Sequence, residues 1–238
     1  MLNFGLGFLF IIVNFILVLL AYRFFGKVGL FVWIAISTIL ANIQVVKTIE
    51  VFSITATLGN TLYGSIFLAT DILNENHSEK DAKKSVWLGF FSAVVMIITM
   101  QLAILFIPAA SDYSQASLVT IFNPTIRIVV GSLVAYLISQ FLDVKVFQKI
   151  RKRFPSDKML WLRNNGSTWF SQLIDTLIFV SIAFVGQFEL SILIEIYITT
   201  YLFKIIIALI DTPFMYLSKI IAKKIQKDWK SDVKKLKY

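Results

Sequence analysis

Five charged residues interrupt segments of the sequence that are otherwise apolar. Asp175 is the clearest case, because it lies near the middle of residues 167–187, a segment long enough to cross a bilayer as a helix and free of other charges. A charge that faces lipid at mid-depth costs from about 3 kcal/mol upward, so each side chain is expected to face protein or water. The five residues are therefore functional candidates: Asp71, Arg127, Asp143, Asp175 and Lys204.

The segment around Asp175 also carries a polar face. Residues four apart share a face of a helix, and two such rows lie side by side here: Ser167, Ser171 and Asp175, then Thr168, Gln172 and Thr176. The hydroxyls and the amide either line a cavity or join packed helices, which such side chains commonly do. The burial of Asp175 is more costly to offset, which favours a functional role for the carboxylate.

The last apolar segment places a cation among aromatic residues. Steps of three and four along a helix put four residues on one face: Tyr197, Tyr201, Lys204 and Asp211. Lys204 lies near mid-membrane, where it either pairs with an aspartate or contacts a ligand directly, since buried charges are usually paired. Pro213 is expected to kink this helix, because it removes a backbone hydrogen bond.

Two further acidic positions lie near the ends of their apolar segments. Asp71 shares a helical face with Glu75, which we expect to be solvated at the membrane interface. Asp143 either lies inside the membrane or snorkels toward the neighbouring basic loop, where Lys145 or Arg151 could pair with it.

The depths of the acidic residues predict a shared site. At a rise of 1.5 Å per residue, Asp71 and Asp143 would lie about 7 Å from the inner ends of their helices, and Asp175 about 12 Å. We therefore expect three carboxylates to converge beside Lys204 in a polar pocket that opens to alternate sides, rather than in a continuous pore. A planar, nitrogen-rich ligand suits this pocket, because a carboxylate accepts two parallel N–H bonds and aromatic rings can stack on the ligand.

The composition indicates an integral membrane protein. The chain has 58% hydrophobic residues and a mean hydropathy of +0.79, which is too apolar for a soluble domain of 238 residues. The apolar residues form long runs instead of alternating ten-residue segments, which favours helices over a β-barrel. We predict an all-α bundle in a single transmembrane domain, residues 1–238, with seven membrane-spanning helices near 3–22, 28–47, 58–76, 85–107, 119–148, 167–187 and 191–220.

The basic residues predict the orientation of this bundle. Nineteen of the 23 Lys and Arg residues fall in loops that lie on one side if the helices alternate, and the opposite loops near 50–58, 108–118 and 186–190 have none. The positive-inside rule then places the N-terminus outside and the basic tail, residues 219–238, in the cytoplasm. Membrane topology, rather than nucleic-acid binding, accounts for the net charge of +9, although the tail could also lie on anionic lipid.

Several kinds of chemistry are absent from the sequence. There is no Cys and the only His is His77, so we expect neither thiol catalysis nor a metal site. No Walker A sequence or glycine-rich nucleotide loop is present, and the serine-rich faces lack a GxSxG motif. These absences predict a protein that is not an enzyme, binds no cofactor and does not itself hydrolyse ATP.

Six short motifs in one order carry a family resemblance. They are Ala69-Thr-Asp71-Ile-Leu-Asn-Glu75, Phe141-Leu-Asp143-Val-Lys-Val-Phe147, Arg163-Asn-Asn-Gly-Ser-Thr168, Ser171-Gln-Leu-Ile-Asp175-Thr176, Tyr201-Leu-Phe-Lys204 and Thr212-Pro213. Between about Ile39 and Tyr216 the sequence resembles the queuosine precursor transporters, the vitamin uptake transporter-like family. Residues 1–27 would then be an extra N-terminal helix before a six-helix family core. Asn76-His77-Ser78 departs from the aromatic-glycine pair that is common there in the family.

The resemblance implies a function in the bacterial inner membrane. It implies a multi-pass importer of 7-cyano-7-deazaguanine or a related 7-deazaguanine base, which feeds the synthesis of queuosine in tRNA. The expected partners are this substrate and the lipid bilayer, not nucleic acid, and a homodimer is plausible. The candidate substrate-binding residues are Asn42, Asp71, Arg127, Asp143, Gln172, Asp175, Thr176, Tyr201 and Lys204.

Two transport mechanisms remain open at the level of sequence. In the first, the chain is a secondary transporter in which Asp175 and Asp143 bind the guanine-like edge and protonation of a carboxylate couples uptake to the proton gradient. Asp71 and Lys204 would adjust the charge, and aromatic residues such as Trp169, Tyr197 and Tyr201 would stack on the base. In the second, the chain is a substrate-binding subunit that needs a separate ATPase module, as in energy-coupling factor transporters. A membrane scaffold or enzyme is a third, weaker alternative.

Overall fold

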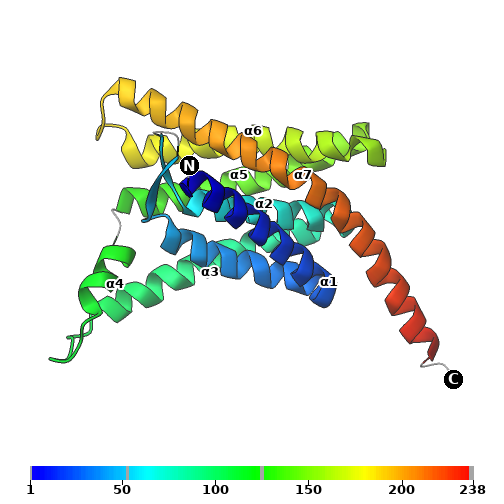
Figure 1. Ribbon diagram of the computed structural model, residues 1–238, viewed down its shortest axis with the longest axis horizontal. Helices are drawn as coiled ribbons and strands as arrows, with labels where there is room; N and C mark the ends of the chain where they lie inside the picture. The colour runs from blue at the N-terminus through cyan, green and yellow to red at the C-terminus, as the bar shows by residue number, and fades with distance from the viewer. Residues whose placement is uncertain (1, 52–53, 124–125, 236–238) are drawn as a thin grey trace.

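The computed structural model describes residues 2–51, 54–123 and 126–235, and it shows a helical bundle with one small β-hairpin (Figure 1). The predicted all-α membrane bundle is confirmed at this level, and the β-hairpin is an addition to it. The elements in chain order are α1 (Leu2–Gln44), β1 (Thr48–Val51), β2 (Ile54–Thr57), α2 (Gly59–Asn76), α3 (Glu79–Ile104), α4 (Gln115–Phe122), α5 (Ile126–Arg153), the 3-10 turn η1 (Asp157–Met159), α6 (Leu160–Phe184) and α7 (Leu190–Lys235).

The long helix α1 reverses direction at Gly26. Gly26 has φ 58° and ψ −144°, a conformation that is open to glycine because it lacks a Cβ. The two halves then pack closely, since a Cβ added at Gly29 would lie 2.1 Å from the Ala21 carbonyl oxygen. Asn3 Nδ2 donates to the Glu50 carbonyl oxygen at 2.9 Å, so the chain returns to its starting level. The two halves match the predicted helices 3–22 and 28–47.

Contacts between distant segments divide the bundle into two ends. Three ion pairs gather basic loops at one end, which we call the basic end: Arg23–Asp228, Lys27–Asp81 and Arg163–Glu75. The other end, the β-hairpin end, holds β1, β2 and α4, and there Arg127 Nε donates to the Ile182 carbonyl oxygen at 2.9 Å. The basic loops thus lie together, as expected for alternating helices. The placement of the basic end in the cytoplasm stays a prediction.

Helix α2 lies in the centre of the bundle. Of its 18 residues, 14 are buried, and it contacts α1, α3, α5 and α7. Because protein rather than lipid surrounds α2, this helix can carry hydroxyl, amide and carboxyl side chains along its length. Among the described residues, five helices are long and apolar enough to cross a membrane, and they correspond to α1, α3, α5, α6 and α7. The count of seven membrane crossings stays a prediction.

Several element boundaries differ from the sequence-based prediction. The predicted helix 119–148 is two helices, because α4 ends at Phe122 and Asn123 (φ −111°, ψ 49°) has left helical geometry, as residues before proline often do. Helix α6 begins at Leu160, seven residues earlier than expected. Helix α7 continues through Pro213 to Lys235, so the predicted basic tail is largely helical and extends away from the bundle (Figure 1).

Candidate functional site

A cavity of about 460 Å³ occupies the β-hairpin end of the bundle. Its upper walls include the exposed residues Val46 and Gln101, so it reaches the surface at that end. The walls are mainly aliphatic and aromatic, and the polar side chains among them include Asn42, Asn60, Gln172, Asp175 and Lys204. An apolar space of this size with a few convergent polar groups is typical of small-molecule sites, which commonly measure about 300–1,000 Å³.

An ion pair lies at the floor of the cavity. Lys204 Nζ of α7 contacts Asp175 Oδ2 of α6, and Ser139 Oγ of α5 donates to Asp175 Oδ1 at 2.9 Å. The two charged side chains are only 9% and 17% exposed, so each offsets the cost of burying the other. Both residues still line the cavity and can therefore reach a ligand. We call Asp175 and Lys204 the floor pair.

Three carboxyl groups lie near one another beneath the floor pair, and we call Asp71 of α2, Asp143 of α5 and Asp211 of α7 the carboxyl triad. All three are buried, with exposures of 0%, 0% and 1%. The Asp71 and Asp143 carboxyls hydrogen-bond to each other, and Asp211 interacts electrostatically with both. The triad is therefore an acidic site inside the bundle, separate from the cavity lining.

Helix α6 supplies hydrogen-bond donors to the triad. Asn164 Nδ2 donates to Asp211 Oδ1 at 2.5 Å, Thr168 Oγ1 donates to Asp71 Oδ2 at 3.4 Å, and Ser171 Oγ donates to Asp143 Oδ1 at 2.9 Å. The polar face predicted for α6 is thus one continuous surface. Its part nearer the basic end serves the triad, whereas Gln172 and Asp175 serve the cavity.

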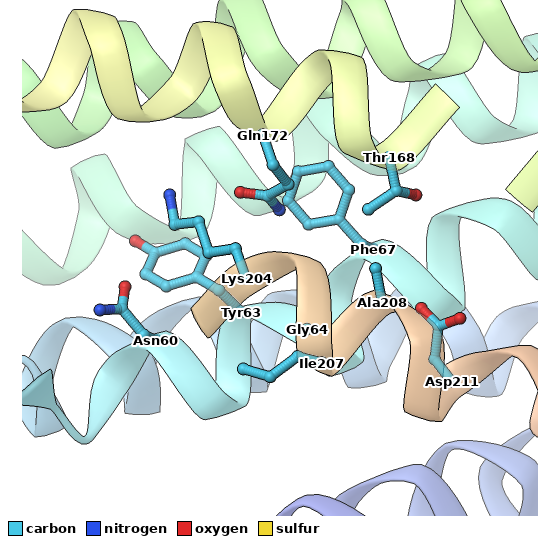
Figure 2. Close-up of a pocket in the computed structure, with 10 residues that line it drawn as sticks. All are labelled: Asn60, Tyr63, Gly64, Phe67, Thr168, Gln172, Lys204, Ile207, Ala208 and Asp211. Atoms are coloured by element: carbon cyan, nitrogen blue, oxygen red, sulfur yellow. The ribbon is translucent and has the colours of Figure 1, made fainter. Parts of the chain in front are cut away.

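A narrow crevice of about 10 Å³ lies between the cavity floor and Asp211 of the triad. Figure 2 shows Gln172 and Thr168 of α6 pointing toward residues of α2 and α7 around this crevice. Five residues line both the crevice and the cavity: Asn60, Tyr63, Phe67, Gln172 and Lys204. Asp211 and Thr168 line the far end of the crevice. Its volume is close to the minimum of about 10–15 Å³ that holds one water molecule.

A cluster of ion pairs lies beyond the triad, toward the basic end. Glu75 Oε1 contacts Arg163 Nη2 at 2.9 Å and Lys219 Nζ at 3.0 Å, and Glu75 Oε2 lies 3.7 Å from Arg151 Nε. Arg163 also donates from Nη1 to the Phe154 and Ser156 carbonyl oxygens, each at 2.8 Å. The expectation that Glu75 is solvated is wrong, because its side chain is only 2% exposed. We call these four charged residues the Glu75 cluster.

The structure distributes the nine predicted binding residues over several places. Four of them line the cavity: Asn42, Gln172, Asp175 and Lys204. Asp71 and Asp143 lie in the triad, so the expected convergence of both with Asp175 is replaced by two separate levels along the bundle. Asp143 pairs with neither Lys145 nor Arg151 among the described contacts; its partners are Asp71 and Ser171.

The other three predicted residues lie outside the cavity lining, and their side chains donate to backbone carbonyls. Arg127 Nη2 donates to Val185 at 2.7 Å, Thr176 Oγ1 to Gln172 at 2.8 Å, and Tyr201 Oη to Trp169 at 3.1 Å. A direct role of these residues in ligand binding stays a prediction.

The aromatic residues proposed for stacking also lie elsewhere. Trp169 and Tyr197, like Tyr201, are outside the cavity lining, where Tyr63, Phe67, Phe179 and Phe203 lie instead. The sequence interpretation also left Asn60 and Asp211 out of the site. Asp211 lies two helical turns from Lys204 on the same face of α7, and this spacing was the signal that could have included it.

Comparisons with known proteins describe the same region. The family model described as "Putative vitamin uptake transporter" matches residues 57–218, which contain all of the triad and the floor pair. A "Probable queuosine precursor transporter" of Bacillus subtilis (strain 168) is 52% identical over 210 residues, covering 88% of this chain and 92% of the relative.

More distant relatives carry similar names. A "Probable queuosine precursor transporter" of Haemophilus influenzae (strain ATCC 51907 / DSM 11121 / KW20 / Rd) is 31% identical over 67% of this chain and 66% of its own length. The "Queuosine precursor transporter" of Escherichia coli (strain K12) is 26% identical over 74% of this chain and 78% of its own length. No solved structure gives a significant match.

Proposed function

We propose that this chain, which belongs to the vitamin uptake transporter family and is similar to queuosine precursor transporters, imports a queuosine precursor. The proposed substrate is 7-cyano-7-deazaguanine or a related 7-deazaguanine base, carried across the bacterial inner membrane. The family is one of transporters, which confirms the prediction that the chain is not an enzyme.

The observation that supports this proposal best is the chemistry of the cavity floor. A guanine-like edge presents adjacent N–H donors next to a carbonyl oxygen. The Asp175 carboxylate can accept the parallel N–H bonds, and Lys204 can donate to the carbonyl, while Gln172 and Asn60 offer further amide contacts. Tyr63 and Phe203 in the walls supply aromatic surfaces for the flat base.

The closed basic end is consistent with one state of an alternating-access cycle. The cavity reaches the surface at the β-hairpin end, whereas the triad and the Glu75 cluster fill the bundle toward the basic end. By the positive-inside rule, the basic end faces the cytoplasm and the cavity faces outward. Import then requires that the contacts around Glu75 separate while the cavity closes above the bound base.

The proposed energy source is the proton gradient. A secondary transporter needs no ATP site, which agrees with the lack of a nucleotide motif in the sequence. The alternative, a substrate-binding subunit of an energy-coupling factor transporter, would need a separate ATPase module. The two proposals differ in one respect that can be measured, namely whether this chain transports alone.

A test in cells uses a strain that cannot synthesise queuosine precursors. With the wild-type chain expressed, queuosine should appear in tRNA when 7-cyano-7-deazaguanine is supplied. Asp175→Asn should reduce the initial uptake rate about 30-fold or more, because losing one side of a desolvated charged contact costs about 2–5 kcal/mol. Asp228→Asn, in the half-exposed pair with Arg23, is the matched control and should transport normally.

Two outcomes would contradict the proposal. Normal queuosine formation with Asp175→Asn would remove the assigned role of the cavity floor. A lack of queuosine with every 7-deazaguanine supplied to the wild type would remove the substrate.

A further inference from the structure

We propose that the carboxyl triad is the site of the coupling proton, and that it is distinct from the substrate site at the floor pair. This inference rests on the proposed transport function and assigns the proton to particular residues. Asp71, Asp143 and Asp211 would take up a proton from the outer cavity and release it toward the basic end during each transport cycle.

The contact between Asp71 and Asp143 requires a proton. Two carboxylates that touch cannot both remain ionised, so one of them must act as the donor in their hydrogen bond. The oxygens Asp71 Oδ1 and Asp143 Oδ2 receive no hydrogen bond from a donor of another residue, which leaves them available for the shared proton. Asp211 Oδ2 is likewise buried without a donor.

The helices packed around the triad supply donors but no cation. Helix α6 contributes neutral side chains only, which are Asn164, Ser167, Thr168 and Ser171. From the other three helices, the charged groups that act on Asp71 and Asp211 are the aspartates of the triad. Among the described residues, the neighbouring cations are engaged elsewhere: Lys204 with Asp175, and Arg151, Arg163 and Lys219 with Glu75. An uncompensated buried charge is expensive, so protons are the means by which the triad is neutralised.

The crevice brings the cavity floor close to Asp211, which interacts electrostatically with the other two aspartates of the triad. It starts at Lys204 and Gln172 on the cavity floor and ends at Thr168 and Asp211, with room for about one water molecule. Toward the basic end, Asp71 is followed one helical turn later by Glu75 and its three cationic partners. In this conformation we expect the proton to exchange with the cavity through Asp211 rather than with the opposite side.

The chemistry of the site favours a proton as the coupling ion. Among the described residues, no group of three or more His, Cys, Asp or Glu side chains could hold a metal ion. Two carboxyls in direct contact fit a shared proton, whereas a metal ion would lie between them and separate them. The step is a simple proton transfer: one carboxylate becomes a carboxylic acid on the outer side and loses the same proton on the inner side.

The experiment uses the full chain in liposomes that enclose a pH-sensitive dye, with 7-cyano-7-deazaguanine added outside and the membrane potential clamped. Wild type should acidify the interior when substrate is added, and an inward gradient of about two pH units should drive accumulation of about tenfold or more. Asp143→Asn and Asp211→Asn should lose both signals. They should keep substrate counterflow between equal pH values, because exchange needs no net proton movement.

Thr70→Val is the matched control, since Thr70 is buried next to Asp71 on α2 but its hydroxyl donates to the Ile66 carbonyl oxygen of its own helix. It should keep proton movement and counterflow. The inference is overturned if uptake by the wild type moves no protons or depends on sodium instead. It is also overturned if Asp143→Asn still accumulates substrate with the gradient, or if both Asn variants lose counterflow as well. Absence of wild-type counterflow with any 7-deazaguanine would instead refute the proposed function.

Discussion

The carboxyl triad and the Glu75 cluster are neighbours in the bundle with opposite charge balance. In the Glu75 cluster, one carboxylate is surrounded by Arg151, Arg163 and Lys219. In the triad, three carboxyls meet with neutral donors from α6 and without a described cation partner. One turn of α2 separates Asp71 from Glu75, so the same helix holds both kinds of environment.

This difference separates a fixed charge from an exchangeable one. Glu75 is compensated by permanent cations, so its charge can stay in place and hold α2, α5, α6 and α7 together at the basic end. The triad can be neutral only when it binds protons, so its charge depends on which side of the membrane it can exchange with. A transporter needs both properties: contacts that keep one end of the bundle closed, and a site whose protonation changes during the cycle.

The largest expected effect on stability comes from removing the fixed charge of Glu75. Glu75→Gln should lower the free energy of unfolding by about 3–5 kcal/mol, because it leaves the buried Arg163 guanidinium without its carboxylate. Thermal unfolding of the purified protein in detergent measures this loss. Glu79→Gln is the matched control, since its pair with Lys83 is exposed and should contribute less than about 1 kcal/mol. Equal losses in the two variants would refute the assigned role of Glu75.

An intermediate effect is expected at the floor pair. Lys204→Met should destabilise the protein by about 2 kcal/mol, because it leaves the Asp175 carboxylate partly buried and unpaired. The double variant Lys204→Met/Asp175→Asn should recover most of that stability but not substrate binding, since it restores neutrality and not the charged contacts. Measuring unfolding and equilibrium binding on all three variants tests this pair. Recovery of binding in the double variant would show that the floor pair is only structural.

The smallest expected effect on stability is in the triad. Asp143→Asn should change the free energy of unfolding by less than about 1 kcal/mol, because an amide closely replaces a carboxyl that shares a proton. The same detergent assay can compare it directly with Glu75→Gln, since both side chains are almost fully buried. A loss as large as that of Glu75→Gln would mean that Asp143 is a fixed anion, contrary to the proton-site proposal.

Local spacing in the sequence predicts the faces of helices well. The row that contains Ser167, Ser171 and Asp175 lies on one polar face of α6 in the structure, as the 3.6-residue period requires. The hydropathy and charge patterns likewise predict the helical bundle and the gathering of the basic loops at one end. Recognition of the family from six motifs is also confirmed.

Tertiary packing determines the environment of each charged residue, which local spacing in the sequence does not predict. Whether Glu75 is solvated depends on α2 being enclosed by other helices, and that enclosure is not encoded in the pattern of α2 alone. The depths predicted for Asp143 and Asp175 already differ by about one turn, but only the packing shows that Asp175 pairs with Lys204 and Asp143 with Asp71. The β-hairpin escaped notice because its two strands are only four residues each.

The central claim is that this chain alone imports a 7-deazaguanine base through the cavity above the floor pair. The most direct measurement is the uptake of labelled 7-cyano-7-deazaguanine into liposomes that contain only this protein, with no ATPase and no ATP. We predict saturable uptake that is reduced about 30-fold or more by Asp175→Asn and unchanged by Asp228→Asn. Absence of uptake by the wild type until an ATPase module is supplied would contradict the claim and favour the binding-subunit alternative.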